Sequence, residues 1–267
     1  MLVMGIDTET NSPDPNVAEL TELAWVVYDT ERETPLLTGG GYALPIDPVK
    51  FELPQKATAI TGITLDDLDR FGRDSRNLIG GMIGATERYG IEWACAHNMP
   101  YDRTVLRRIV DYWWRGNDPM AVSFGAISWI DTWRDLPDAP GGSGKLAHHL
   151  ADIGVIMPFK HRALFDALGS LRLLQHYGVE RAIESALTPR IVVQALVPYD
   201  EKQDAKDRWY RWEDPFKDKS KLYPKRWVKV MRETEYAREF EEAPFPLEVI
   251  DEIPATAREA TWAKSKQ

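Results

Sequence analysis

Two acidic side chains follow the first apolar run of the chain, and their spacing could support metal chemistry. Residues 2–6 are apolar and predict a buried strand, and Asp7 and Glu9 come directly after it. Because side chains on a strand alternate between its faces, Asp7 and Glu9 would share one face. Two adjacent carboxylates repel each other unless a cation lies between them, and oxygen ligands suit Mg²⁺ or Mn²⁺. A strand that simply runs into a polar turn would show the same pattern, so both interpretations stay open here.

A third carboxylate lies near the start of a predicted helix. Pro100 opens this helix, and the apolar residues over 105–110 have helical spacing. Asp102 falls in the first turn. A carboxylate at that position is favoured by the helix dipole, so helix capping is the alternative to a chemical role.

A histidine and a fourth carboxylate flank the start of a later helix. The apolar pattern predicts a helix from Ala163 to near Gly178, with Asp166 inside it and His161 just before it. Five residues on an ideal helix correspond to a rotation of about 140°, so the two side chains could not share a helical face. We therefore expect His161 on the preceding loop, from which it can reach Asp166. A histidine at this position can also be a cap or a surface residue.

The order of the predicted elements indicates the fold class. Strands are expected first, at 2–6, 19–29 and 36–44, and later apolar runs at 91–96 and 127–130 alternate with helical segments. This order is typical of an α/β fold, in which helices flank a mixed sheet. The ligand crevice of such a sheet lies at strand ends and at the helix starts that face them.

Composition and charge narrow the class of protein. The chain has 267 residues, of which 43% are hydrophobic and 28% charged, and no apolar run is long enough to span a membrane. The start of the sequence lacks the pattern of a signal peptide, and the single Cys95 cannot form an internal disulfide, which fits a cytoplasmic protein with no membrane partner. Residues 190–267 hold 16 Lys and Arg and 16 Asp and Glu, so the net charge of −9 belongs to the preceding part.

The last part of the chain is expected to form a separate unit. We place a first domain at 1–187, a small α+β domain at 188–253 and a flexible tail at 254–267. Residues 202–232 hold 11 Lys and Arg against 5 acids, with aromatic residues among them. Basic side chains attract phosphates and aromatic rings stack on unpaired bases, so Trp209, Trp212 and Trp227 are candidate contacts for nucleic acid. In so small a unit these tryptophans could equally form the core.

Three stretches together resemble a known enzyme family. GIDTET, AHNMPYDRTVL and HRALFDA are similar, in order and setting, to the motifs of the DEDDh branch of the DnaQ-like 3′→5′ exonucleases, with exonuclease X and its relatives as the nearest likeness. The likeness covers about residues 1–180, and ATAITGIT and WIDTWRDL are weaker echoes. A tyrosine-type relative would carry Tyr where this chain has Arg162.

The resemblance implies both a fold and a set of roles. It implies an RNase H-like fold with a mixed five-stranded sheet, and two Mg²⁺ or Mn²⁺ ions with His161 as general base. The implied metal ligands are Asp7, Glu9, Asp102 and Asp166, with Asp7 between the two ions. The implied substrate contacts are Thr8, Thr10, Thr61 and Asn98. Thr61 departs from the family pattern, because many relatives have His-Gly-Ile where this chain has Thr61-Gly62-Ile63.

These roles predict a function and leave alternatives. We expect a metal-dependent 3′→5′ exodeoxyribonuclease that releases nucleoside 5′-monophosphates from DNA 3′ ends and prefers single strands. A 3′→5′ exoribonuclease on the same scaffold is the first alternative. A module that binds nucleic acid or a polymerase without activity is the second. A polymerase or a DNA repair protein is a candidate partner.

Overall fold

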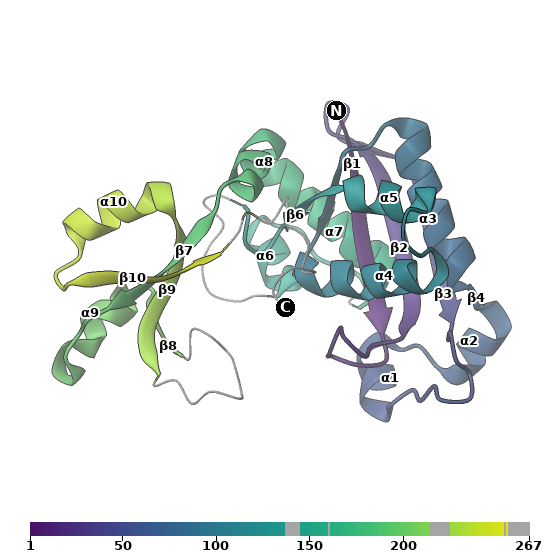
Figure 1. Cartoon of the computed structure of the whole chain (residues 1–267), viewed down its shortest axis with the longest axis horizontal. Coiled ribbons are helices and arrows are strands. Elements are labelled where there is room, and N and C mark those ends of the chain that lie inside the picture. The colour runs from purple at the N-terminus through teal and green to yellow at the C-terminus, as the bar shows by residue number, and fades with distance from the viewer. Residues whose placement is uncertain (137–144, 160, 214–224, 254, 256–267) are drawn as a thin grey trace. The chain divides into compact units, whose positions relative to one another are not determined.

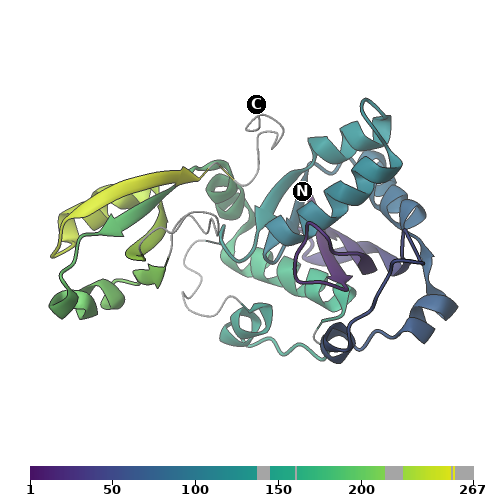
Figure 2. The same cartoon turned by 60° about the horizontal axis from the view of Figure 1, so that its bottom comes forward.

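The chain divides into two compact units in the computed structural model. The structure describes residues 1–136, 145–159, 161–213, 225–253 and 255. The units are Met1–Ser185 and Ala186–Gln267 (Figures 1 and 2). Apart from residue 255, the predicted tail 254–267 lies outside the described residues, as does the stretch 214–224 of the basic and aromatic segment.

A mixed sheet of six strands forms the centre of the first unit, in the order β4-β3-β2-β1-β5-β6. Its strands are β1 (Leu2–Thr10), β2 (Leu20–Asp29), β3 (Thr34–Leu44), β4 (Arg73–Asp74), β5 (Trp93–Ala96) and β6 (Ser128–Asp131). The first three are antiparallel, while β5 pairs parallel with β1, and β6 with β5. The expected mixed α/β sheet is confirmed. The expected number of five strands was too low, because the two-residue β4 pairs with the end of β3 and is too short to show a sequence pattern.

Helices cover both faces of this sheet (Figure 1). The described helices of the first unit are α1 (Gln55–Thr61), α2 (Leu65–Phe71), α3 (Ser75–Tyr89), α4 (Met99–Trp113), α5 (Pro119–Ala126), α6 (Leu146–Asp152), α7 (Ala163–Tyr177) and α8 (Val179–Leu187), the last of which crosses the unit boundary. Helix α7 packs along β1 and β2, whereas α3 and α4 pack on the other face. Because helices lie on both sides, the β1 residues Val3, Met4 and Ile6 are all fully buried.

A glycine in β1 lets α7 approach the sheet closely. A Cβ atom at Gly5 would lie 2.6 Å from Leu171 Cδ1 and 2.9 Å from the Ala167 carbonyl oxygen, and real structures do not tolerate such contacts. The absence of a side chain at Gly5 therefore brings the first turns of α7 against β1. The consequence is that the acidic end of β1 lies beside the start of α7.

Among its described residues, the second unit has a four-stranded antiparallel sheet and two helices of its own. Its order is β10-β7-β9-β8, with strands β7 (Arg190–Ala195), β8 (Arg211–Glu213), β9 (Arg226–Arg232) and β10 (Leu247–Ile253). A short 3₁₀ turn η1 (Tyr199–Glu201) leads into α9 (Lys202–Asp207), and α10 (Glu233–Glu242) follows β9. Its apolar core includes Ile191, Val193, Tyr210, Met231 and Phe245. Within the described parts of both units, no helix has the length and apolar character that crossing a bilayer requires.

Candidate active site

A cavity of about 470 Å³ opens at the carboxyl end of β1, and all five residues predicted to do the chemistry line it. These are Asp7 and Glu9 from β1, Asp102 from the start of α4, His161 from the loop before α7 and Asp166 from the first turn of α7. The other described lining residues are Thr8, His97, Asn98, Tyr101, Lys145, Leu146, Ala147 and His148. Residues separated by most of the first unit's sequence therefore converge on one site.

Side chains from β1, from the loop before α7 and from α7 form a group that could hold a metal ion. One ligand atom each of Glu9, His161 and Asp166 lie within 4.8 Å of one another. His161 has a left-handed backbone with φ of 56°, and its N–H donates to the Asp166 carboxylate. This hydrogen bond favours the charged carboxylate and so lowers the pKa of Asp166, whereas burial and the charge of Glu22 raise it. The loop position expected for His161 is the one that the structure has, since α7 begins only at Ala163.

Asp102 is turned toward β1 and does not serve only as a cap of its own helix. Its Oδ1 accepts the Thr8 N–H at 2.9 Å and the Thr8 hydroxyl at 2.7 Å, and the side chain is buried. These two bonds join the start of α4 to the carboxyl end of β1. Thr8, predicted as a substrate contact, lines the cavity but uses its hydroxyl hydrogen to hold Asp102.

The other predicted substrate contacts fall in different places. Asn98 lines the cavity at the start of α4, whereas Thr10 and Thr61 are not among the described lining residues. The Thr10 hydroxyl is hydrogen-bonded to Tyr101 Oη and to the Ser12 carbonyl. The Thr61 hydroxyl donates to the Ala57 carbonyl one turn earlier in α1, at 3.1 Å.

Burial and mutual repulsion raise the pKa of every carboxyl group in the cavity. Burial is the largest cause throughout. It raises the pKa of Glu9 to about 8, with help from Asp166 and Glu22. The pKa is about 7 for Asp102 and about 6 for Asp166, and that of Asp7 lies well above its usual range because Asp102 and Asp166 are also near. Crowded carboxylates of this kind fit a divalent cation, because oxygen donors are the ligands that Mg²⁺ and Mn²⁺ prefer.

These pKa values predict how the metal-free protein responds to pH. Ordinary carboxyl groups titrate near pH 4, whereas those of Glu9, Asp102 and Asp166 titrate at about 8, 7 and 6 in the folded chain. Between about pH 4 and pH 8 these carboxyl groups keep their protons in the folded state and lose them in the unfolded state. The free energy of unfolding therefore falls as pH rises.

We therefore expect the melting temperature in EDTA to fall between pH 5 and pH 8, and excess Mn²⁺ to reverse the fall at pH 8. A Glu9→Gln variant serves as the control, because it should show a shallower fall. A melting temperature in EDTA that rises over this range would contradict the clustering of these carboxyl groups.

Sequence reasoning assigned no role to Asp131, which supports the site from β6. Asp131 is fully buried, and its Oδ1 accepts the backbone N–H groups of Asn98 and Trp133, each at 3.0 Å. Asn98 has a left-handed backbone with φ of 63° immediately before α4. The carboxylate of Asp131 therefore holds the turn from which α4 and Asp102 begin. An acid that ends an apolar strand, as Asp131 does in WIDTWRDL, is the signal that could have indicated this role.

Two histidines, His97 and His148, also line the cavity, and the sequence pattern around them did not predict a role. His97 lines the cavity, and its Nδ1 lies 3.1 Å from the Thr132 hydroxyl. Its ring centre is 5.6 Å from that of His149, which is buried, whereas His148 lines the cavity. The adjacent residues His148 and His149 therefore lie in different surroundings, one at the cavity and one in the interior.

Comparison with known proteins yields structures and no sequence relatives. No protein-family model and no curated protein matches the chain. An exonuclease I structure matches 73% of this chain with 18% identity and a TM-score of 0.56, and the match covers 48% of its own length. Escherichia coli exonuclease I in complex with a dA16 oligonucleotide matches 97% of this chain and 66% of its own, with 15% identity and a TM-score of 0.56.

The chain is also similar in structure to a smaller nuclease, most of whose length it matches. The nuclease domain of 3′hExo, a DEDDh family member bound to rAMP, matches 66% of this chain and 90% of its own, with 19% identity and a TM-score of 0.52. This chain thus spans about half the length of the exonuclease I structure first named. The nearest likeness to exonuclease X stays a prediction. The mixed sheet, its flanking helices and these matches show that the chain has the α/β fold of the DEDDh 3′-exonucleases.

Proposed function

We propose that the chain is a 3′→5′ exodeoxyribonuclease that depends on divalent metal ions and releases nucleoside 5′-monophosphates from DNA 3′ ends. The observation that carries this proposal is the convergence of four carboxylates and an imidazole on one cavity at the end of β1. The structural neighbours, which are 3′-exonucleases, support it.

The four carboxylates would hold two Mg²⁺ or Mn²⁺ ions, since the charges of Asp102, Asp166 and Glu9 all act on Asp7. Such ions would activate the attacking water and stabilise the negative charge on the scissile phosphate and on the departing 3′-oxygen. Asp102 and Asp166 are held for this task by Thr8 and by the His161 N–H. The pocket is therefore arranged before substrate arrives.

His161 is the proposed general base. Its side chain is exposed at the cavity and lies within reach of Glu9 and Asp166. Histidine side chains ordinarily titrate near neutral pH, so an imidazole here can accept the proton of the attacking water. The water oxygen forms a bond to phosphorus, the bond from phosphorus to the 3′-oxygen breaks, and the released nucleotide carries the 5′-phosphate.

Whether the substrate is DNA or RNA is the question on which the alternative function, an exoribonuclease, has support. Exonuclease I is bound to dA16 and dT13 oligonucleotides in solved structures, which favours DNA. The nuclease domain of 3′hExo is bound to rAMP, and another 3′-exonuclease recognises a histone mRNA stem-loop, which keeps an exoribonuclease as the second candidate. A polymerase or repair partner stays a prediction.

A degradation assay tests the proposal. Matched 5′-labelled DNA and RNA single strands and a DNA duplex are incubated with Mg²⁺ or Mn²⁺, and we expect a ladder of shortened DNA that EDTA abolishes. An Asp166→Ala variant, purified in parallel, shows whether a contaminating nuclease produces the ladder. Full-length strands with both metals would leave only the inactive binding module, and shortening of RNA alone would favour the exoribonuclease.

The second unit is proposed to contact the strand outside the cavity. Trp209 is 67% exposed and Trp212 is 55% exposed, so both rings could stack on unpaired bases. Trp227 differs, because its ring packs 5.4 Å from that of Trp212 and against the apolar core of the unit. Arg211 and Lys225 are close to these tryptophans in the sequence, and both side chains are exposed.

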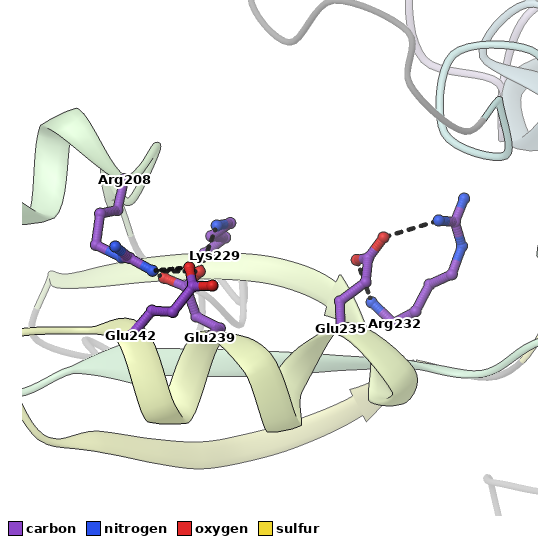
Figure 3. A network of polar contacts seen from close by, with 6 residues as sticks. All are labelled: Arg208, Lys229, Arg232, Glu235, Glu239 and Glu242. Carbon is purple, nitrogen blue, oxygen red and sulfur yellow. Dashed lines mark hydrogen bonds and ion pairs between the residues drawn. The ribbon is translucent and has the colours of Figure 1, made fainter.

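Part of the basic charge in this unit is already neutralised. Arg208 pairs with Glu239 at 3.0 Å, Lys229 contacts the same carboxylate at 3.3 Å, and Arg232 pairs with Glu235 at 2.8 Å (Figure 3). These three side chains belong to the internal packing of the unit. The electrostatic attraction inferred from the sequence is therefore weaker than the charge count suggests, and the aromatic rings carry more of the proposal.

A paired variant tests this contact. Each stacked base contributes roughly 1–3 kcal/mol, so a Trp209→Ala, Trp212→Ala double variant should bind a fluorescent DNA single strand at least about tenfold more weakly in EDTA. Phe240→Ala removes another exposed aromatic ring of the same unit, 59% exposed on α10, and should leave the dissociation constant unchanged. Equal binding by all three proteins would assign the tryptophans to a structural or protein-docking role.

A further inference from the structure

A buried glutamate on β2 lies directly beside the proposed metal ligands. Glu22 is the cross-strand partner of Glu9 and is buried. Like charges that face each other across a sheet destabilise it, and Glu22 raises the pKa of Glu9 and of Asp166. A buried acid at this position therefore needs a compensating partner.

Arg162 is that partner, and it follows His161 in the chain. Its Nη2 donates to Glu22 Oε1 at 2.9 Å and its Nε donates to Oε2 at 3.2 Å. The same Nη2 donates to Tyr42 Oη at 2.9 Å, and the guanidinium lies over the Tyr42 ring at 5.3 Å. A planar guanidinium that binds a carboxylate through two hydrogen bonds has a fixed orientation, so the backbone of Arg162 is fixed with it.

Glu22 also binds the first turn of α7. Its Oε2 accepts the N–H of Ala163, the first residue of the helix, at 3.1 Å. The residue at the N-cap position, Arg162, makes no capping bond of its own. One carboxylate from β2 therefore replaces the local cap and holds two consecutive residues at the start of α7.

The bonds of Glu22 to Arg162 and Ala163 fix the positions of His161 and Asp166, which lie on either side of these two residues in the chain. His161 precedes the anchored residues and has a left-handed backbone, and Asp166 follows in the first turn of α7. Arg162 extends toward Glu22 and Tyr42, whereas His161, the residue before it, lines the cavity. Movement of this turn would separate His161 and Asp166 from Glu9, with which they form the group within 4.8 Å.

We propose that Glu22 and Arg162 are a positioning pair, whose hydrogen bonds hold Asp166 beside Glu9 for metal binding and hold His161 at the cavity. This inference rests on the proposed function for its link to catalysis, but its link to metal binding is separate. Neither residue lines the cavity among those described, so both act through the residues they hold.

Variants of the pair test the proposal through Mn²⁺ affinity, measured by calorimetry, and through kcat and KM on a DNA strand. Partners of this kind typically change metal affinity or activity 10–100-fold when removed. We expect Glu22→Gln and Arg162→Met each to weaken Mn²⁺ binding and lower kcat by about 10-fold or more, with little change in KM. The double variant should lose no more than either single variant, because both break one contact. Arg162→Lys keeps the charge and should restore part of the loss.

Arg108→Met is the matched control. Arg108 donates to the carbonyls of Pro15 and Ala18, at 3.0 and 2.8 Å, and does not line the cavity among the described residues. Its loss should lower the melting temperature while Mn²⁺ affinity and kcat stay unchanged. If Glu22→Gln and Arg162→Met lower only the melting temperature, as Arg108→Met does, the pair is merely structural and the proposal is overturned. If the wild-type chain degrades no nucleic acid, the proposed function fails and the Mn²⁺ affinities alone decide on the pair.

Discussion

An Asp7→Asn variant should lose more than about 10³-fold in the rate of strand degradation, and its metal-free form should melt at a higher temperature than the wild type. The loss, on the order of 4 kcal/mol, follows because Asp7 is a proposed metal ligand on which the charges of Asp102, Asp166 and Glu9 all act. The gain in stability follows because an amide of the same shape removes one charge from a repelling cluster. The measurements are single-turnover degradation with Mg²⁺ and thermal melting in EDTA.

Opposite changes in activity and stability distinguish a functional charge from a structural one. An Asp118→Asn variant is the control, because Asp118 caps α5 through the Met120 N–H and lies outside the described cavity wall. That change should lower the melting temperature slightly and leave the rate unaltered. If Asp7→Asn melted at a lower temperature in EDTA and kept its rate, Asp7 would be an ordinary strand-end residue.

A His161→Gln variant should lower kcat by about 10²–10⁴-fold while KM changes little. The imidazole is proposed to accept a proton from water and not to bind the strand, so its removal affects the chemical step. In the wild type, kcat should rise as pH increases through the neutral range, because only the neutral imidazole can accept a proton. In His161→Gln this rise should disappear.

A second histidine on α7 provides the comparison for that experiment. His176 lies in the last turn of the helix and is not among the described cavity residues, so His176→Gln should keep both the rate and the pH profile. A His161→Gln protein with the wild-type pH profile would show that another group accepts the proton.

The long elements of the fold could be predicted because their side-chain patterns extend over many residues. The strands expected at 19–29 and 36–44 correspond to β2 and β3, and the helix expected from Ala163 to near Gly178 corresponds to α7. The elements that were not predicted lack such a pattern. Strand β4 has two residues and β8 has three, and α5 is apolar around most of its circumference, so it shows no polar face.

The acidic residues that converge on the cavity could be named from the sequence, and the residues that hold them in place could not. Asp7, Glu9, Asp102 and Asp166 follow strands or begin helices, and these positions are visible in local patterns. Glu22 bonds to Arg162, which lies 140 residues away, and nothing near either residue indicates the partner. Thr10 and Thr61 were expected to contact the substrate. Their hydroxyls instead bond within the protein, Thr10 to Ser12 and Tyr101 and Thr61 to Ala57, and neither is among the described lining residues.

The most direct test of the central claim is the number of Mn²⁺ ions that the wild-type chain binds in the presence of a nucleoside 5′-monophosphate, measured by calorimetry at neutral pH. Four converging carboxylates with raised pKa values predict two ions per chain, and fewer in Asp7→Asn. Binding of no ion by the wild type, or the same number by Asp7→Asn, would contradict the assignment of this cavity as a metal-dependent active site.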